Sequence, residues 1–309
     1  MISGLLGGLL WGLDTVVLGI ALVSSKFTST ETALFLAPFV STFLHDTFSA
    51  IWMFIYMGAK KELPNVLKAL KTKSGKFIIL GALLGGPIGM TGYVNAIKYI
   101  GPSYTAILSA LFPAVGALFS YIFLKEKMRW WQIIGLLVAI GGVIGLGYSP
   151  SNSEITNLFL GFGFALLCII GWASEAVICA YGMKDPDVSD KHALQIRQTV
   201  SALFYGLIIL PLLKGWSFSL SIFTDNSIIY IIASALFGTV SYLCYYKAIN
   251  KIGASKAMSL NITYSAWSII FSFILIGTKP TLSSIIFGII IIIGSLIAAV
   301  NIEEFKNKK

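Results

Sequence analysis

The stretch YVNAIKYIGPSYTAIL (93–108) returns 152 residues further along the chain as YYKAINKIGASKAMSL (245–260). The two segments align without a gap and match Gly101 with Gly253. Long self-similarity of this kind is typical of a duplicated architecture, and many membrane transporters consist of duplicated halves with the solute site between them. We therefore predict two homologous halves.

The composition predicts that both halves lie in a membrane. Of the 309 residues, 57% are hydrophobic and 11% charged, whereas about one quarter of a typical globular chain is charged. About twenty apolar residues in a helix cross the hydrocarbon core. The sequence contains ten such runs: 2–23, 31–58, 76–97, 103–124, 130–148, 157–182, 190–213, 226–248, 254–276 and 282–301.

A second repeated motif indicates how the ten predicted helices are divided. WGLDTVV (11–17) aligns with WASEAVI (172–178), and each copy has an acid three residues after its tryptophan. We predict an all-α polytopic membrane protein with two five-helix repeats, residues 1–150 and 151–309, joined by the polar segment SPSNSEITN (149–157). Because five crossings are an odd number, the second repeat has inverted topology.

The basic residues sort by loop. The net charge is +9, but its distribution over alternate loops argues against a nucleic-acid partner and for the positive-inside rule. That rule predicts a multi-pass protein of the bacterial inner membrane with cytoplasmic N- and C-termini, and with residues 60–76 on anionic lipid headgroups. The predicted inside loops and the C-terminus contain Lys60, Lys61, Lys68, Lys71, Lys73, Lys76, Lys125, Lys127, Arg129, Lys184, Lys191, Lys251, Lys256, Lys306, Lys308 and Lys309.

Three acids lie deep in predicted helices: Asp14, Asp46 and Glu175. A charged side chain at the bilayer centre costs about 2.5 to 3.5 kcal/mol on insertion scales, so such residues face a cavity, pair with a cation or serve function. Either a solute site or a structural ion pair would explain them. Asp14 and Glu175 share the motif of the two repeats, which favours a common site for both.

The repeat also brings polar pairs together. His45 and Asp46 correspond to Arg197 and Gln198 in the second half, so the two pairs are expected to face each other. An Asp46–Arg197 ion pair would neutralise two buried charges and connect the halves, with consequences for gating. His45 could instead carry a proton near neutral pH. We assign these residues and Asp14 to coupling or gating.

Aromatic residues recur near the buried acids. Trp11 and Trp172 each share a helix face with an acid three residues later. Packing is one explanation. The other is a cage for a quaternary ammonium ion, which donates no strong hydrogen bonds and is held by ring faces worth about 0.5 to 2 kcal/mol each, balanced by an anion. The candidate solute site consists of Trp11, Trp172, Glu175, Tyr93, Tyr242, Tyr245, Asn261 and Tyr264.

The predicted fold and several motifs resemble a known family. GPSYTAILSALFPAVGALFSYIFLKEKMRWWQIIGLLVAIGGVIGLG (101–147) resembles the EamA branch of the drug/metabolite transporter superfamily. GPIGMTGYVNAIKYIG (86–101), GWASEAV (171–177) and SLNITYSAW (259–267) look like the LicB-type choline importers of bacteria. This resemblance implies an aromatic cage and a membrane carboxylate for choline. Asp14 departs from that pattern and leaves room for another cation or for proton coupling.

We therefore expect a permease that imports choline or a related quaternary ammonium solute by alternating access, driven by the membrane potential or a proton gradient. The alternative within the fold is an exporter of amino acids, drugs or other metabolites. An integral-membrane enzyme using Asp46, His45 and Glu175 is disfavoured by the lack of a metal-ligand cluster or nucleophile motif. No cofactor or metal is expected, and a homodimer remains possible.

Overall fold

The computed structural model describes residues 1–147 and 157–300, which are helical with short connections. Within these residues, ten helices are long and apolar enough to cross a membrane. They are Ile2–Leu22, Glu31–Ala59, Lys73–Gly101, Ile107–Leu124, Trp130–Gly147, Leu158–Gly182, Asp190–Leu212, Ser227–Ile252, Ala254–Ile276 and Leu282–Ala299. The prediction of a ten-span all-α membrane protein is confirmed, and the chain is a multi-pass membrane protein.

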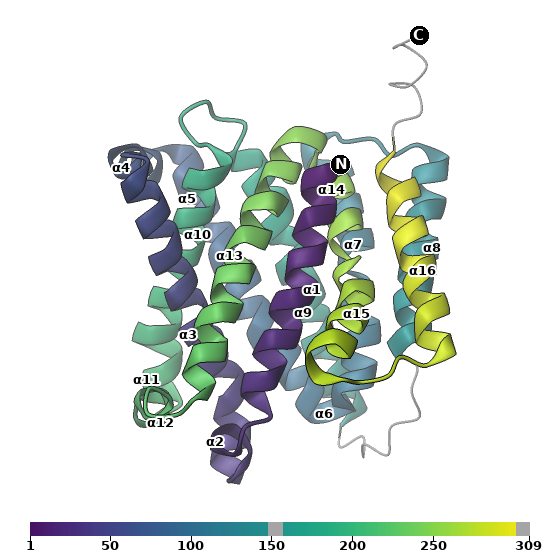
Figure 1. Ribbon diagram of the computed structural model, residues 1–309. Helices are drawn as coiled ribbons and strands as arrows, with labels where there is room; N and C mark the ends of the chain where they lie inside the picture. The colour runs from purple at the N-terminus through teal and green to yellow at the C-terminus, as the bar shows by residue number, and fades with distance from the viewer. Residues whose placement is uncertain (148–156, 301–309) are drawn as a thin grey trace.

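Several spans are built from more than one helical segment (Figure 1). The segments are α1 (Ile2–Leu22), α2 (Ser25–Thr28), α3 (Glu31–Ala59), α4 (Leu63–Lys71), α5 (Lys73–Leu83), η1 (Leu84–Gly89), α6 (Met90–Ser109), α7 (Phe112–Phe119), η2 (Ser120–Leu124), α8 (Trp130–Gly147), α9 (Leu158–Gly182), α10 (Asp190–Phe204), η3 (Tyr205–Ile209), α11 (Leu210–Leu212), α12 (Trp216–Ile222), α13 (Ser227–Ile252), α14 (Ala254–Asn261), α15 (Tyr264–Ile276) and α16 (Leu282–Ala299). The three η segments are π-helical.

Side-chain caps explain where several helices begin. The Thr30 hydroxyl accepts a hydrogen bond from the backbone N–H of Ala33 at 3.0 Å, and Asn157 does the same for Leu160 at 3.0 Å. Short polar side chains at this position satisfy N–H groups that have no partner within the helix. These caps fix the entry of α3 and α9, two of the three helices that contribute acids to the cavity described below.

The backbone repeats itself where the sequence does. Gly101 and Gly253 both have positive φ, 78° and 87°, with ψ of 165° and 161°. Lys125 and Gly277, also 152 residues apart, are both left-handed, with φ of 59° and 76°. Matching backbone breaks at matching positions support the duplication that the sequence predicts. The predicted linker 149–157 lies almost wholly outside the described residues.

The two repeats run in opposite directions. In Figure 1, α5 begins beside α4 at the upper end of the bundle, whereas its counterpart α13 begins beside α12 at the lower end. We call the upper end, which contains the N-terminus and α4, the α4 end. Helices of the two repeats pack together, with α1 against α13 and α8 against α16. The inverted arrangement places equivalent helices around a shared interior.

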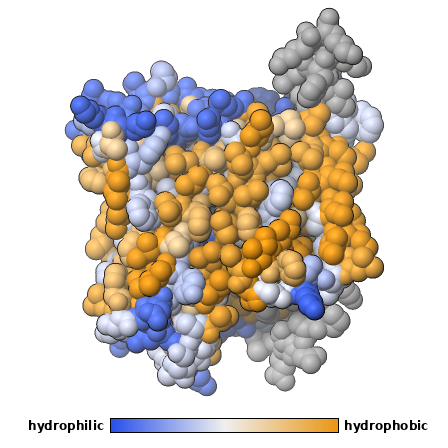
Figure 2. Space-filling view, viewed as in Figure 1, coloured by the Kyte–Doolittle hydropathy of each residue, from blue (hydrophilic) through white to orange (hydrophobic). Residues whose placement is uncertain are grey.

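The outer surface fits a bilayer. On the face shown in Figure 2, a wide hydrophobic belt crosses the molecule, with hydrophilic residues concentrated at the α4 end. Exposed apolar side chains of α8 and α16 include Ile133, Leu137 and Ile289. Apolar side chains in such numbers would be costly in water and are stable against lipid tails.

Candidate functional site

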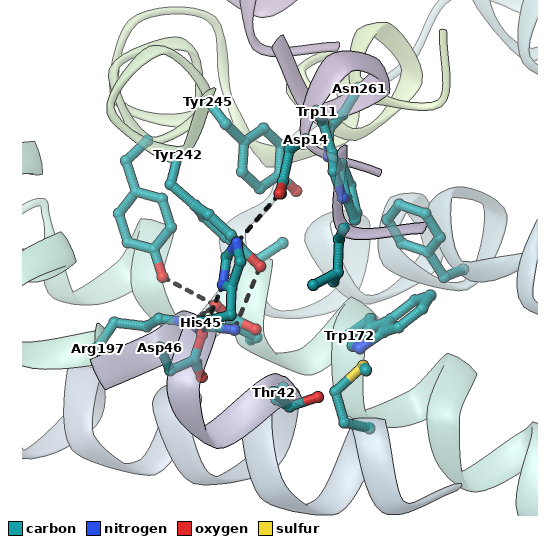
Figure 3. A pocket seen from close by; sticks show the side chains of 17 residues that line it. Trp11, Asp14, Thr42, His45, Asp46, Trp172, Arg197, Tyr242, Tyr245 and Asn261 are labelled. Carbon is teal, nitrogen blue, oxygen red and sulfur yellow. Dashed lines mark hydrogen bonds and ion pairs between the residues drawn. The ribbon is translucent and has the colours of Figure 1, made fainter. Parts of the chain in front are cut away.

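A cavity of about 150 Å³ lies inside the bundle. It suits a small solute, because sites for drug-sized ligands occupy roughly 300 to 1,000 Å³. Both repeats contribute to its wall, with Trp11 and Trp172 on one side and Arg197 and Asp46 on the other (Figure 3). The lining consists of Trp11, Asp14, Leu18, Thr42, His45, Asp46, Gly85, Met90, Phe112, Trp172, Glu175, Ala176, Arg197, Tyr242, Tyr245, Tyr246 and Asn261.

Glu175 on α9 borders the cavity and belongs to an ion pair at the same time. Its Oε1 accepts hydrogen bonds from Arg197 Nε at 2.9 Å and from the Tyr246 hydroxyl at 3.0 Å. Both Glu175 and Arg197 are buried. The sequence left two interpretations of Glu175 open, an acid that faces a cavity and a member of a structural ion pair. The carboxylate of Glu175 has both positions in the structure.

Asp46 on α3 lies on the other side of the same guanidinium. Arg197 Nη1 is 3.4 Å from Asp46 Oδ2, and the Ser201 hydroxyl donates to that oxygen at 2.6 Å. The expected Asp46–Arg197 pair is thus present. Gln198 packs beside it and accepts from Arg197 Nη1 through Oε1 at 2.7 Å, although it does not border the cavity.

His45 joins Asp46 to Asp14. Its Nε2 lies 3.2 Å from Asp14 Oδ1, and its Nδ1 lies 3.5 Å from Asp46 Oδ1. The Ser234 hydroxyl on α13 also donates to Asp14. The charged side chains therefore form one connected network that runs from α1 through α3 and α10 to α9.

The formal charge of this network is negative. Three carboxylates, Asp14, Asp46 and Glu175, face one guanidinium, Arg197, and a histidine, His45. Even a protonated His45 leaves one negative charge in excess. A buried charge excess is unfavourable unless a counter-ion or a bound proton balances it.

Ring faces form much of the remaining wall. The ring centroids of Trp11 and Tyr242 are 6.4 Å apart, and those of Tyr242 and Tyr245 are also 6.4 Å apart. The Arg197 guanidinium lies 4.7 Å from the Tyr242 centroid, a cation–π distance. The protein thus already places one cation against one of these rings.

Tyr93 and Tyr264, which the sequence assigned to the solute site, pack behind its tryptophans. Tyr264 stacks on Trp11 at 4.5 Å between centroids, and Tyr93 stacks on Trp172 at 5.5 Å. Neither tyrosine borders the cavity. Their rings instead restrict the orientation of the two indoles that do.

The glycines of η1 allow α9 to approach the cavity. A Cβ on Gly85 would collide with the Glu175 carboxylate, and a Cβ on Gly89 would lie 2.8 Å from Trp172 Cδ1. The two glycines therefore permit close packing of η1 against α9. The segment is π-helical and contains Pro87, which marks a local irregularity of the helix.

Sequence reasoning missed several lining residues. Tyr246 lies next to Tyr245 and binds Glu175, while Phe112 meets Trp172 edge-on at 5.8 Å. Met90 and Thr42 also line the cavity. The run Tyr242, Tyr245, Tyr246 was visible in the sequence, but no local pattern distinguishes Phe112 or Met90 from lipid-facing apolar residues. Among the described residues, no group of three His, Cys, Asp or Glu side chains could hold a metal ion.

The two inverted five-helix repeats and the polar interior define a duplicated membrane carrier. The model of the EamA-like transporter family matches residues 1–148 and 159–300. The chain belongs to this family of the drug/metabolite transporter superfamily, and it is a transporter and not an enzyme.

Individual relatives agree with this membership. Protein LicB of Haemophilus influenzae is 42% identical over 190 residues, which cover 62% of this chain and 63% of LicB, less than two thirds of either. An uncharacterised transporter of Clostridium kluyveri is 24% identical over 82% of this chain and 83% of its own length. A solved crystal structure superposes with a TM-score of 0.70 over 99% of both chains at 15% identity, a likeness of fold alone.

Proposed function

We propose that this transporter imports choline or a related quaternary ammonium solute by alternating access. The main support for this proposal is the excess of negative charge around the cavity, where the carboxylates of Asp14, Asp46 and Glu175 outnumber the guanidinium of Arg197. A quaternary ammonium ion supplies the missing positive charge without needing a hydrogen-bond acceptor. The similarity to LicB and the motifs shared with LicB-type choline importers support the same solute class.

The ring faces are the second support. Trp11, Trp172 and Tyr245 border the cavity beside the acids, so a trimethylammonium group there would contact aromatic faces and lie near a carboxylate. Each such contact contributes about 0.5 to 2 kcal/mol once water is removed. Glu175 shares its charge between Arg197 and the incoming cation in this proposal.

An exporter of anionic or zwitterionic metabolites fits the cavity less well. A solute carboxylate would need Arg197, but the guanidinium already donates to Glu175, Asp46, Gln198 and the Tyr242 hydroxyl. Releasing it would deprive Glu175 and Asp46 of their shared guanidinium. The arrangement therefore favours a cationic solute over an amino acid.

We further propose that the α4 end faces the bacterial cytoplasm. Lysines 60, 61, 68, 71 and 73 are exposed there, around the amphipathic α4, as the positive-inside rule requires. In either orientation, an inside-negative membrane potential favours cation entry by about 2.3 kcal/mol per charge and 100 mV. The proposed orientation is tested with Lys68→Cys and a membrane-impermeant thiol reagent. The cysteine should react only after the cells are permeabilised, and labelling in intact cells would contradict the proposed orientation.

Liposome uptake tests the solute. Purified protein is reconstituted, an inside-negative potential is imposed, and labelled choline is followed. Saturable uptake is expected, reduced at least tenfold by Trp172→Ala and Glu175→Gln. Trp130→Ala is the matched control because Trp130 is 69% exposed on the outer surface. Uptake that is absent, or equal in all variants, overturns the choline proposal.

The same liposomes separate uniport from proton coupling. A pH gradient without a membrane potential drives accumulation only if protons accompany the solute. The connected chain Asp14–His45–Asp46 offers a place for such a proton. Asp14→Asn would then abolish pH-driven accumulation, whereas potential-driven uptake, which needs no proton, would fall by a smaller factor.

A further inference from the structure

Glu126 lies outside the cavity, in the connection between η2 and α8. Its carboxylate accepts three hydrogen bonds from the start of α14: from the backbone N–H groups of Ala254 and Ser255, both at 3.1 Å, and from the Ser255 hydroxyl at 3.0 Å. A carboxylate at a helix N-terminus is held by its free N–H groups and by the helix dipole. Glu126 is therefore bound firmly to the second repeat.

The backbone is shaped for this contact. Gly253 precedes α14 with φ of 87°, a conformation that favours glycine. A Cβ at Gly253 would lie 2.8 Å from the Glu126 carboxylate. The missing side chain thus admits the carboxylate, and the positive φ turns the first N–H groups of α14 toward it.

The contact joins the two halves at one end of the carrier. Glu126 belongs to the first repeat and α14 to the second, and the contact lies at the α4 end (Figure 1). At its other end α14 finishes at Asn261, which borders the cavity. Glu126 consequently holds a helix that extends from this end of the molecule to the solute site.

The repeat lacks this contact at the opposite end. The 152-residue offset pairs Glu126 with Thr278, and Ala254 with Pro102. Threonine has no carboxylate, and proline has no backbone N–H to donate. The inverted halves are thus chemically unequal at the two ends that must open in turn during alternating access.

We propose that Glu126 is a positioning residue that latches the two repeats together at the α4 end, and that its absence from the opposite end biases the carrier toward the state in which the α4 end is closed. Opening this end separates the carboxylate from three donors, whereas Thr278 and Pro102, the equivalent positions at the opposite end, cannot form that set of hydrogen bonds. The latch acts on the carrier's conformational equilibrium and does not depend on which solute is carried.

Distance measurements between spin labels test the latch without any solute. Labels are placed at Lys127→Cys and Lys251→Cys, two exposed positions beside Glu126 and Gly253, with Cys244 replaced by serine and the fully buried Cys168 and Cys179 retained. The parent is expected to show a predominantly short distance. Glu126→Gln replaces one of the two oxygens that accept from Ala254 and from Ser255 by an NH2 donor. A longer distance should therefore appear, with the open-to-closed ratio raised on the order of tenfold.

Two further variants make the result decisive. Ser255→Ala removes only one of the three donors and should raise the open-to-closed ratio by a smaller factor. This variant still tests the latch if Glu126→Gln fails to fold. Glu31→Gln, at an exposed glutamate of α3, should leave the distances unchanged. Unchanged distances in folded Glu126→Gln and in Ser255→Ala, or an equal shift in Glu31→Gln, overturn the latch, whatever the outcome of choline uptake.

Discussion

Arg197 and Glu175 form a buried ion pair that connects α10 to α9 at the edge of the cavity, with 2.9 Å between Nε and Oε1. The same guanidinium contacts Asp46, 3.4 Å away, from α3. One cation thus holds two acids from different repeats. Stability and the solute site therefore depend on the same side chains.

Removing this cation should destabilise the fold. Arg197→Gln removes the guanidinium that pairs with the buried Glu175 and Asp46, and losing one member of a buried pair costs about 3 to 5 kcal/mol. Thermal unfolding in detergent should show a large drop in Tm. In the double variant with Glu175→Gln the loss should be smaller than the sum of the two single losses; an additive result would mean that the pair is not coupled.

Adding a methyl group at Gly85 should disturb Glu175. The new Cβ of Gly85→Ala would overlap the Glu175 carboxylate, so either that side chain or η1 must shift. A loss of about 1 to 3 kcal/mol, typical of overpacking, is expected in thermal unfolding. Gly163→Ala in α9 is the control because its Cβ would meet no atom within 4 Å; an equal loss there would refute the steric explanation.

Ring faces should matter for a charged solute more than for a neutral one. Trp11→Phe keeps a ring at the cavity wall, whereas Trp11→Leu removes it. On the choline proposal, Trp11→Leu should weaken choline binding by about 2- to 30-fold, the equivalent of one cation–π contact. Competition by choline and by its uncharged analogue 3,3-dimethylbutan-1-ol measures this. Equal weakening for both ligands would indicate packing alone.

The contact between Glu62 and His192 predicts a pH dependence of stability. Hydrogen bonds from Asn65 and His192 lower the pKa of the Glu62 carboxyl below its ordinary 4.5. A depressed carboxyl pKa stabilises the fold above the ordinary value, and that contribution is lost as the pH falls through the lower folded value. The Tm difference between the protein and Glu62→Gln should therefore shrink below pH 4.5.

Asn65→Ala provides the control for this pH dependence. Asn65 Nδ2 donates to Glu62 Oε2 at 2.7 Å and is the largest cause of the lowered pKa. Its removal should reduce the Tm difference at neutral pH while leaving its direction unchanged. A difference that grows as the pH falls would contradict the assignment.

Part of the site was predictable because the repeat supplies long-range information. The equivalence of Asp46 with Gln198, and of His45 with Arg197, predicted facing polar pairs, and the Asp46–Arg197 contact is present. The two tryptophans were identified by the acids three residues after them, and both border the cavity. The periodicity of a helix could not predict the remaining lining residues. It shows which residues share one face of the helix, but not whether that face points to the cavity, to another helix or to lipid.

Composition and the 152-residue repeat determined by themselves that this chain crosses a membrane ten times in two inverted halves, since apolar length and duplication are properties of the chain alone. Only the tertiary structure decided that Arg197 serves Glu175 and Asp46 together, that Ser234 binds Asp14, and that Tyr93 lies behind Trp172. These contacts depend on the orientation of each helix about its axis and on the distance between neighbouring helices, which glycines such as Gly85 keep short. Both are determined by packing between segments that are far apart in the sequence.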